Sequence, residues 1–171
     1  MAASPSFATA RTLLGRAARL LGGNQQTPSP ALISYARQVQ PLVERVERAY
    51  ADWLAHTQES PNPEMLANTA SVQRWELASA AEALAALEPP AEAQRVHEGL
   101  LQGLRLSARA YQLLSLGYRS TTYATVCDGH TLLGDAQRAL RPIAEQLAHW
   151  AEPRGQVASP GPAPARQRGA S

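Results

Sequence analysis

Four histidines and one cysteine are the side chains in this 171-residue chain best suited to metal binding or proton transfer. Cys127 and His130 are three residues apart, so on a helix they share one face and could supply two ligands for a soft metal. Two ligands do not complete a metal site, and we expect Cys127 to be an ordinary small core residue. We expect His130 to be half-buried and bonded to a neighbour. The sequence therefore predicts no metal site and no cofactor.

His97 is a second candidate because it falls on the apolar side of a predicted helix, where a polar ring must find a partner. If neighbouring helices are antiparallel, His97 faces Glu82 and Glu145, and a carboxylate–imidazole pair would raise its pKa. Two interpretations stay open. His97 is either a hydrogen-bonded buried residue that fixes the helix register, or a group that binds a ligand or transfers a proton. Gln73, on the preceding predicted helix, allows the same two interpretations.

The motifs of several enzyme classes do not occur in the sequence. No Glu is followed by His at the third position, so the Glu-x-x-His pairs of di-iron carboxylate bundles are missing. The chain also contains no glycine-rich phosphate-binding motif, no Gly-x-Ser-x-Gly elbow and no His-Glu-x-x-His. Since no pair of nucleophile and base can be read either, we expect a protein that is not an enzyme.

The fold class follows from composition and periodicity. The chain contains 33 Ala and 22 Leu but few β-branched residues, which favours helices over strands. Apolar residues alternate at spacings of three and four, as in packed helices, through residues 32–53, 66–87, 93–118 and 126–150. Short connections make sequence neighbours antiparallel. We therefore predict an all-α, up-down-up-down four-helix bundle over residues 30–152.

Helix ends are marked by short local signals. Ser29-Pro30 and Asn62-Pro63 each place a capping side chain before a proline at the first helical position. Pro89-Pro90 separates the second helix from the third. Gly117 is expected to end the third helix, with hydroxyl caps following up to Thr122. These signals give helices of about 26 to 30 residues, or about 40 to 45 Å.

Two prolines lie inside predicted helices. Pro41 and Pro142 each remove a backbone hydrogen bond and bend the helix that contains them. In an antiparallel arrangement the two bends fall at a similar height, near Gly99 and Gly103. We expect either a tolerated bend with close helix packing over the glycines, or a local pocket at that end of the bundle.

The start of the third predicted helix carries a recognisable pattern. Residues 87–92 read Leu-Glu-Pro-Pro-Ala-Glu, His97 follows seven residues after the second proline, and Leu100-Leu101 precede a stripe of small residues. This Pro-Pro-x6-His pattern resembles helical bundles of uncharacterised bacterial proteins, many of them extracellular lipoproteins. The resemblance covers the second to the fourth predicted helix and implies no activity. Because the chain lacks a lipobox cysteine, a signal peptide and a membrane span, we expect a cytoplasmic location, with peripheral membrane attachment as an option.

Residues 1–29 combine a predicted amphipathic helix at residues 6–22 with a polar linker. Its apolar arc contains Phe7, Leu13, Leu14, Leu20 and Leu21, and its basic arc contains Arg11, Arg16 and Arg19. An isolated helix of this length is only marginally stable in water, so we expect it to fold when it binds another surface. A protein partner, an anionic membrane surface and the bundle itself are the candidates, and a targeting role is a further alternative.

Charge separates the body of the chain from its ends. All 16 basic residues are Arg; residues 28–152 carry a formal charge of −4 and the two ends together carry +6. A negative body repels phosphate, so we expect no nucleic-acid partner. Residues 153–171 are rich in Pro, Gly, Ala and Arg and are predicted to form a disordered tail.

These observations predict a non-enzymatic binding module that docks through residues 6–22. The alternative is a ligand- or metal-binding bundle that uses His97, or Cys127 together with His130. Homodimerisation is also open, for instance through flanks that contain Trp75 and Tyr35.

Overall fold

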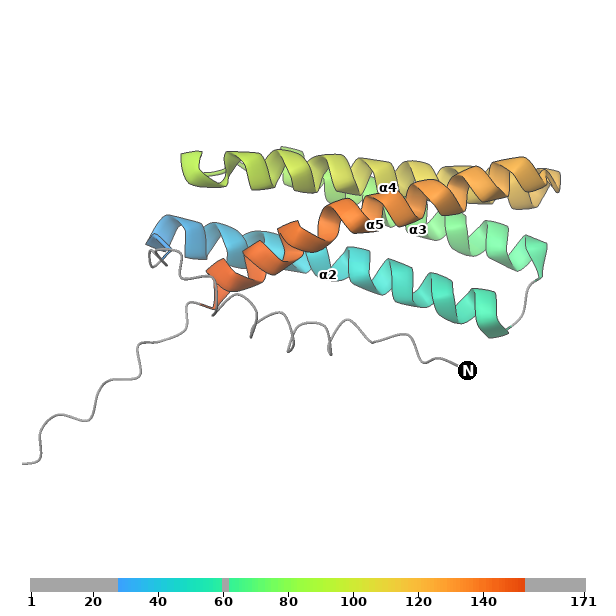
Figure 1. Cartoon of the computed structure of the whole chain (residues 1–171), viewed down its shortest axis with the longest axis horizontal. Helices are drawn as coiled ribbons and strands as arrows, with labels where there is room; N and C mark the ends of the chain where they lie inside the picture. The colour runs from blue at the N-terminus through green and yellow to red at the C-terminus, as the bar shows by residue number, and fades with distance from the viewer. Residues whose placement is uncertain (1–27, 60–61, 153–171) are drawn as a thin grey trace, which may run out of the picture.

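The computed structural model describes residues 28–59 and 62–152, and within these ranges its regular structure is entirely helical. Four α-helices follow one another, α2 (Pro30–Glu59), α3 (Pro63–Ala85), α4 (Gln94–Ser120) and α5 (Tyr123–Ala151), and a single 3-10 turn, η1 (Ala91–Ala93), precedes α4 (Figure 1). The predicted all-α fold is confirmed. The predicted docking helix at residues 6–22 and the predicted tail at 153–171 lie outside the described residues.

Two of the predicted helix starts are confirmed in atomic detail. The backbone N–H of Glu64 donates to Asn62 Oδ1 at 3.0 Å, with Pro63 as the first residue of α3. The backbone N–H of Leu32 donates to Ser29 Oγ at 3.3 Å at the start of α2. Each capping side chain satisfies a backbone donor that the helix itself cannot pair. Local sequence signals therefore predict both of these helix starts.

The corner between α4 and α5 differs from the prediction. Gly117 does not end α4, because the helix continues to Ser120 and the left-handed residue is Thr121, with a φ of 52°. The N–H of Thr122 donates to the carbonyl of Gly117 at 2.9 Å and closes the helix end. Gly117 serves packing instead, since a Cβ at this position would lie 2.8 Å from the backbone nitrogen of Val126.

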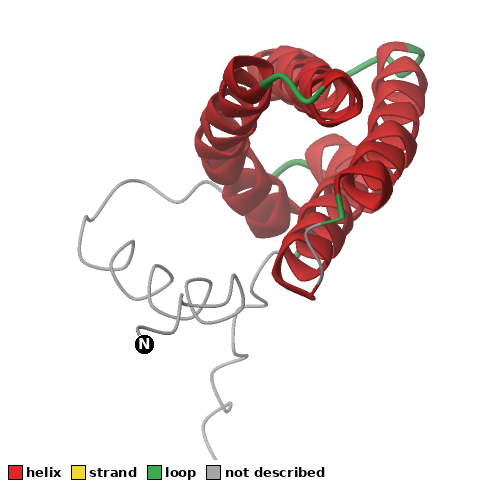
Figure 2. Cartoon of the chain, turned by 90° about the vertical axis from the view of Figure 1, so that its right-hand side faces the viewer, coloured by secondary structure: helices red, strands yellow, loops and turns green. Residues whose placement is uncertain are grey.

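The four helices surround a shared core in the ring order α2, α3, α4, α5 (Figure 2). Helix α4 packs extensively against both α3 and α5, whereas α2 contacts its two neighbours much less. The predicted apolar positions of all four helices supply the core, and its largest fully buried side chains include Trp53, Tyr111, Leu77, Leu100 and Leu114. Burial of these apolar side chains is the main source of stability for the bundle.

Contacts between α4 and α5 are close because glycines on one helix receive large side chains from the other. The position of a Cβ on Gly103 is 2.3 Å from Leu140, and that of a Cβ on Gly129 is 2.8 Å from Leu114.

Two hydrogen bonds cross the core between α2 and α4, which are not neighbours in the ring. The Tyr35 hydroxyl bonds to His97, and the Tyr111 hydroxyl donates to the carbonyl of Ala49 at 3.1 Å.

A helix that crosses a bilayer has to be both long enough and apolar enough. None of the helices in residues 28–59 and 62–152 meets both requirements.

Candidate functional site

His97 is buried, but its partner differs from the predicted one. Its Nδ1 lies 3.0 Å from the hydroxyl of Tyr35 on α2. The expected pairing with Glu82 or Glu145 is wrong: Glu82 is exposed, and Glu145 bonds to Arg141 on its own helix at 3.2 Å. A rotation of α4 by part of a turn decides which neighbouring helix a residue on its apolar side faces. The spacing of residues in the sequence does not fix that rotation.

The electrostatics of this pair follow from burial. Burial lowers the pKa of His97 from its ordinary value and outweighs the opposing effect of the nearby Glu98 carboxylate, so the predicted rise is wrong. Burial also raises the pKa of Tyr35 to about 12. Tyr35 is only 3% exposed, so it does not offer the surface flank for homodimerisation that the sequence suggested. Both rings are neutral at physiological pH and act as a buried hydrogen-bonded pair.

We expect the stability of the bundle to fall as the pH drops below about 6.5, the ordinary His value. Desolvation in the folded chain lowers the pKa of both His97 and His130. Between the folded and unfolded pKa values, the unfolded chain therefore binds protons that the folded chain does not bind. The stabilising contribution is complete above that value and is lost as the pH falls toward the folded-state pKa values. Urea unfolding at several pH values measures the slope of the free energy of unfolding against pH.

The variant His97→Gln keeps a polar group near Tyr35 but does not titrate, and it should therefore show a shallower slope than the unmodified chain. His149→Gln, which changes an exposed histidine on α5, serves as the matched control. Equal slopes for His97→Gln and the unmodified chain would show that His97 does not contribute to the pH dependence.

Cys127 and His130 lie in an aromatic setting at the α4–α5 end of the bundle. His130 is exposed rather than half-buried as expected, although its Nε2 is 3.5 Å from the Tyr118 hydroxyl and its ring centroid is 5.9 Å from that of Trp53. The Cys127 thiol is free and half-buried, at the margin of the core rather than inside it. Across residues 28–59 and 62–152, no three His, Cys, Asp or Glu side chains gather where they could hold a metal ion. The arrangement gives Cys127 and His130 no third ligand.

Gln73 departs from the expectation of a satisfied core residue. It is 5% exposed, and its Oε1 is buried without a hydrogen-bond partner. A buried polar atom of this kind typically costs about 1–3 kcal/mol unless a partner reaches it. Of the two candidate residues that are buried, His97 and Gln73, only Gln73 has a buried side-chain atom without a partner in the described fold.

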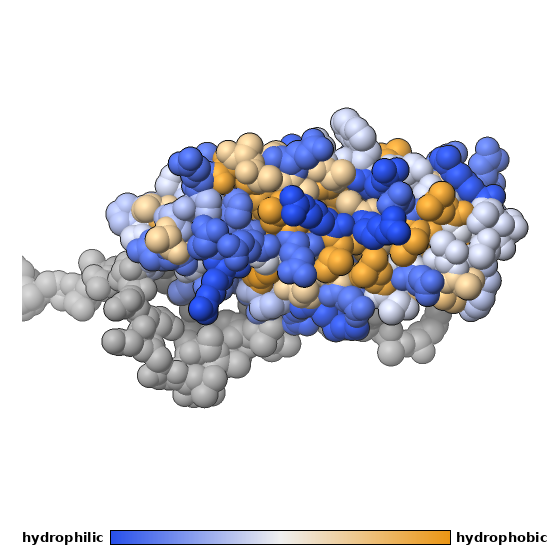
Figure 3. Space-filling model, turned by 90° about the horizontal axis from the view of Figure 1, so that it is seen from above, coloured by the Kyte–Doolittle hydropathy of each residue, from blue (hydrophilic) through white to orange (hydrophobic). Residues whose placement is uncertain are grey.

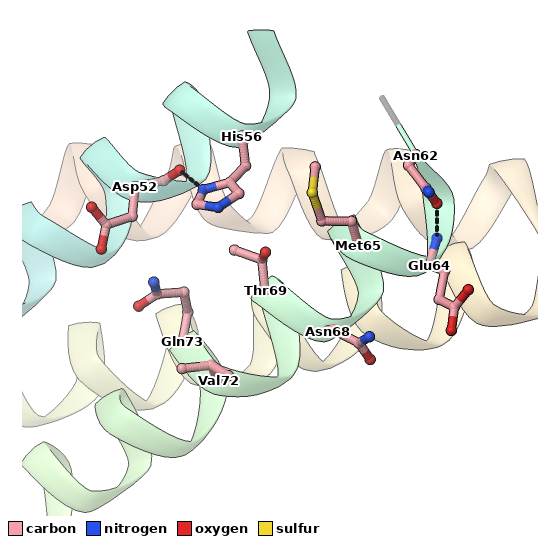
Figure 4. Close-up of a pocket in the computed structure, with 9 residues that line it drawn as sticks. All are labelled: Asp52, His56, Asn62, Glu64, Met65, Asn68, Thr69, Val72 and Gln73. Atoms are coloured by element: carbon pink, nitrogen blue, oxygen red, sulfur yellow. Dashed lines mark hydrogen bonds between the residues drawn. The ribbon is translucent and has the colours of Figure 1, made fainter. Parts of the chain in front are cut away.

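Gln73 borders a surface pocket of about 530 Å³ between the C-terminal half of α2 and the first half of α3 (Figure 4). Such a volume lies within the range of about 300–1,000 Å³ typical of small-molecule sites. The lining residues are Asp52, His56, Asn62, Glu64, Met65, Asn68, Thr69, Val72 and Gln73. Polar side chains from two helices thus face a common space.

Of the residues that line this pocket, only Gln73 was predicted from the sequence. His56 and Asp52 are four residues apart on α2, and the His56 Nδ1 lies 2.7 Å from the carbonyl oxygen of Asp52. Because a carbonyl only accepts, Nδ1 carries the hydrogen, and in the neutral ring Nε2 is left as an acceptor. The spacing of polar residues on the last turns of α2, directly before the Asn62 cap, is the signal that could have indicated a site.

A second, narrower cleft lies between α2 and α5, with Leu100 of α4 among its lining residues. Its volume is about 40 Å³, and its walls include Val43, Tyr50, Leu140 and Ala144. At this level of the bundle Ile143 packs on Gly99 and Leu140 on Gly103, and the small apolar cleft lies beside them. Pro41 and Pro142 lie inside α2 and α5, as predicted.

No family model, curated protein or solved structure matches this chain. The resemblance to uncharacterised bacterial bundles therefore stays a prediction, and the function has to be argued from the residues themselves.

Proposed function

We propose that this chain is a non-enzymatic binding module, built on an up-down-up-down four-helix bundle that docks through a basic amphipathic helix at residues 6–22. The docking surface is a protein partner or an anionic membrane surface on the cytoplasmic side. The observation that supports an interaction role for the bundle is a set of large apolar side chains on the outside of α3 and α4. Trp75 is 72% exposed, Val72 55% and Leu116 52%.

These side chains belong to adjoining turns of two packed helices. Ser71 Oγ of α3 lies 2.8 Å from Ser115 Oγ of α4, and Arg119 donates to Ser71 Oγ at 3.2 Å. Val72 and Leu116 are the immediate sequence neighbours of this serine pair. On the side of the bundle where α4 lies, apolar side chains gather along the middle of the face between hydrophilic ones (Figure 3). Exposed apolar surface of this kind is typical of interaction sites.

The alternating direction of the helices is supported by which residues pair. Along α4 and α5 the paired numbers run in opposite senses, from Gly99 with Ile143 to Gly117 with Val126. Along α2 and α4 they run in the same sense, from Tyr35 with His97 to Ala49 with Tyr111. Both observations fit a bundle in which each helix reverses the direction of the one before it.

Deletion of residues 1–27 tests the docking role. We expect the full chain to sediment with vesicles that contain phosphatidylglycerol and the shortened chain to remain in the supernatant. Each Arg near an anionic surface contributes about 1 kcal/mol, so the loss of three corresponds to roughly a hundredfold weaker binding before apolar contacts are counted. Far-UV circular dichroism of both chains checks that the bundle stays helical.

A triple variant in which Arg11, Arg16 and Arg19 are each replaced by Gln keeps the apolar arc and serves as the matched control. Vesicle binding that survives this change but not the deletion would show that the apolar arc, rather than the three Arg charges, attaches the chain to the vesicle. The docking role is lost if the shortened chain associates with vesicles and with protein partners as strongly as the full chain.

A ligand-binding role is the second candidate function, and the unpaired amide of Gln73 favours it. Neither His97 nor the pair of Cys127 and His130 gains support as a ligand site. His97 is occupied by Tyr35, and His130 is in contact with Trp53 and Tyr118.

A further inference from the structure

We propose that the outer face formed by α3 and α4 binds an acidic amphipathic helix of a protein partner. We call it the basic face, because exposed arginines surround two exposed apolar side chains on it; its residues are Arg74, Trp75, Arg105, Arg109, Leu116 and Arg119. The inference rests on the proposed interaction role of the bundle and names the chemistry of the partner. It does not depend on docking through residues 6–22.

Charge is distributed unevenly over the bundle. Residues 28–152 carry a formal charge of −4, but α4 contains four Arg and one Glu and so has a formal charge of +3. The carboxylate of α4, Glu98, accepts from Gln94 Nε2 at 2.8 Å and lies seven residues before Arg105. The exposed side of α4 from Arg105 to Arg119 is therefore positive, although the bundle as a whole is negative.

Neutral side chains hold two of the arginines in place. Arg109 donates to Gln112 Oε1 at 2.7 Å, and Arg119 donates to Asn68 Oδ1 at 3.4 Å and to Ser71 Oγ at 3.2 Å. Such acceptors orient a guanidinium group without cancelling its charge. Arg109 and Arg119 are thus preorganised for carboxylates at defined positions, which an ordered protein segment offers and a fluid layer of lipid headgroups does not.

The basic face also lacks a countercharge from the bundle itself. Among the side chains of residues 28–59 and 62–152, the ion pairs are those of Arg138 with Asp135 and of Arg141 with Glu145, all on α5. No described carboxylate therefore pairs with an arginine of the basic face. A carboxylate of a partner would supply the countercharge.

The apolar side chains lie between the charged ones. Ser71 Oγ of α3 is 2.8 Å from Ser115 Oγ of α4; Trp75 follows Ser71 by one turn, and Leu116 follows Ser115 directly. Both apolar side chains are more than half exposed, and apolar and hydrophilic side chains adjoin on the side of the bundle where α4 lies (Figure 3). Trp and Arg are enriched at the residues that contribute most to protein interfaces. The composition of the face thus favours a protein partner.

Charge decides which helix fits. The predicted helix at residues 6–22 contains three Arg and no acidic residue, so it would place like charges on the basic face. A second copy that met the same face across a two-fold axis would bring arginine against arginine. Arg105 and Arg119 are 14 residues apart on α4, or about 21 Å. An amphipathic helix of about 15 residues, with Asp or Glu at both ends and apolar residues between them, matches both the charge and the length.

The test is fluorescence anisotropy of a labelled synthetic peptide of about 16 residues, the Glu peptide, with Glu at both ends and leucines at spacings of about three and four between them. The Gln peptide, in which Gln replaces every Glu, is the comparison ligand. We expect the full chain to bind the Glu peptide and to bind the Gln peptide about tenfold more weakly. Arg109→Gln combined with Arg119→Gln, and separately Trp75→Ala, should each weaken binding of the Glu peptide about tenfold.

Matched controls separate the basic face from other arginines. Arg45→Gln combined with Arg48→Gln makes the same change at exposed positions on α2. Replacement of Arg11, Arg16 and Arg19 by Gln removes the charge of the predicted docking helix instead. Both control variants should bind the Glu peptide as the unmodified chain does.

The proposal is overturned if the Glu peptide does not bind at about 100 μM, or if the Gln peptide binds equally well. It is also overturned if either control weakens binding as much as the Arg109 and Arg119 double variant, because general attraction to arginine then explains the effect. A double variant that no longer sediments with phosphatidylglycerol vesicles, together with an unbound Glu peptide, would assign the face to a membrane instead. A chain that binds vesicles through residues 6–22 but not the Glu peptide loses this proposal alone and keeps the docking role.

Discussion

Replacement of Trp53 by alanine is expected to lower the free energy of unfolding by about 3–5 kcal/mol, the usual range for truncation of a buried Trp. Trp53 is 1% exposed. Its ring meets Tyr111 edge-on, with centroids 5.8 Å apart, and it lies 6.1 Å from Tyr118 and 5.9 Å from His130. One side chain of α2 therefore contacts both α4 and α5. Urea unfolding followed by far-UV circular dichroism measures the change.

Trp75→Ala is the matched control for this prediction, because it makes the same truncation at a position that is 72% exposed. We expect a change within about 0.5 kcal/mol, as for most surface substitutions. If the two variants lose equal stability, the contacts of Trp53 do not hold α2 on the bundle. Trp75→Ala should instead weaken association with a protein partner. We therefore expect the Trp53 substitution to change stability and the Trp75 substitution to change binding.

The second large effect is expected at the corner between α4 and α5. Gly117→Ala should destabilise the bundle by about 1–3 kcal/mol, because overpacking forces the backbone to move. The added Cβ would lie 2.7 Å from Val126 Cγ2, 2.8 Å from the Val126 nitrogen and 3.2 Å from the carbonyl carbon of Thr125. A side-chain tip could turn away, but the backbone of α5 cannot. Differential scanning calorimetry is expected to show a lower Tm.

Gly134→Ala provides a control of opposite sign. A Cβ at Gly134 meets only the end of the Arg138 side chain, at 4.0 Å. Since Ala exceeds Gly in helix propensity by about 1 kcal/mol, this variant should have a higher Tm. A higher Tm for both variants would contradict this prediction and would mean that α5 can shift away from Gly117 at little cost.

The secondary structure and most of the core could be predicted from the sequence because their causes are local. Caps such as Asn62 act on a donor two residues away, and spacings of three and four indicate which side of a helix is apolar. The predicted end of α4 at Gly117 was wrong because its cause is not local. The helix ends at Thr121, which adopts the left-handed conformation, and Gly117 instead lies inside α4 where the backbone of α5 packs against it. Tertiary packing overrode a local preference.

The candidate site could be predicted only in part. Gln73 and His97 were recognised as polar residues on apolar stripes, and both are buried. Their partners could not be predicted, because successive helical residues differ by about 100° in direction and a small rotation exchanges one neighbour for another. Asp52 and His56 were missed for a related reason. They are unremarkable on α2 alone and form a pocket only when α3 lies beside them.

The two hydrogen bonds across the core have a consequence for the wall of that pocket. Tyr35 and His97 differ by 62 in sequence number, and so do Ala49 and Tyr111. The bonds are 14 residues apart along each helix, or about 21 Å, so α2 can neither slide past α4 nor swivel about its axis without breaking one of them. Asp52 and His56 follow directly after the second bond. The positions of Asp52 and His56 thus depend on Tyr111 of the opposite helix α4, which does not line the pocket.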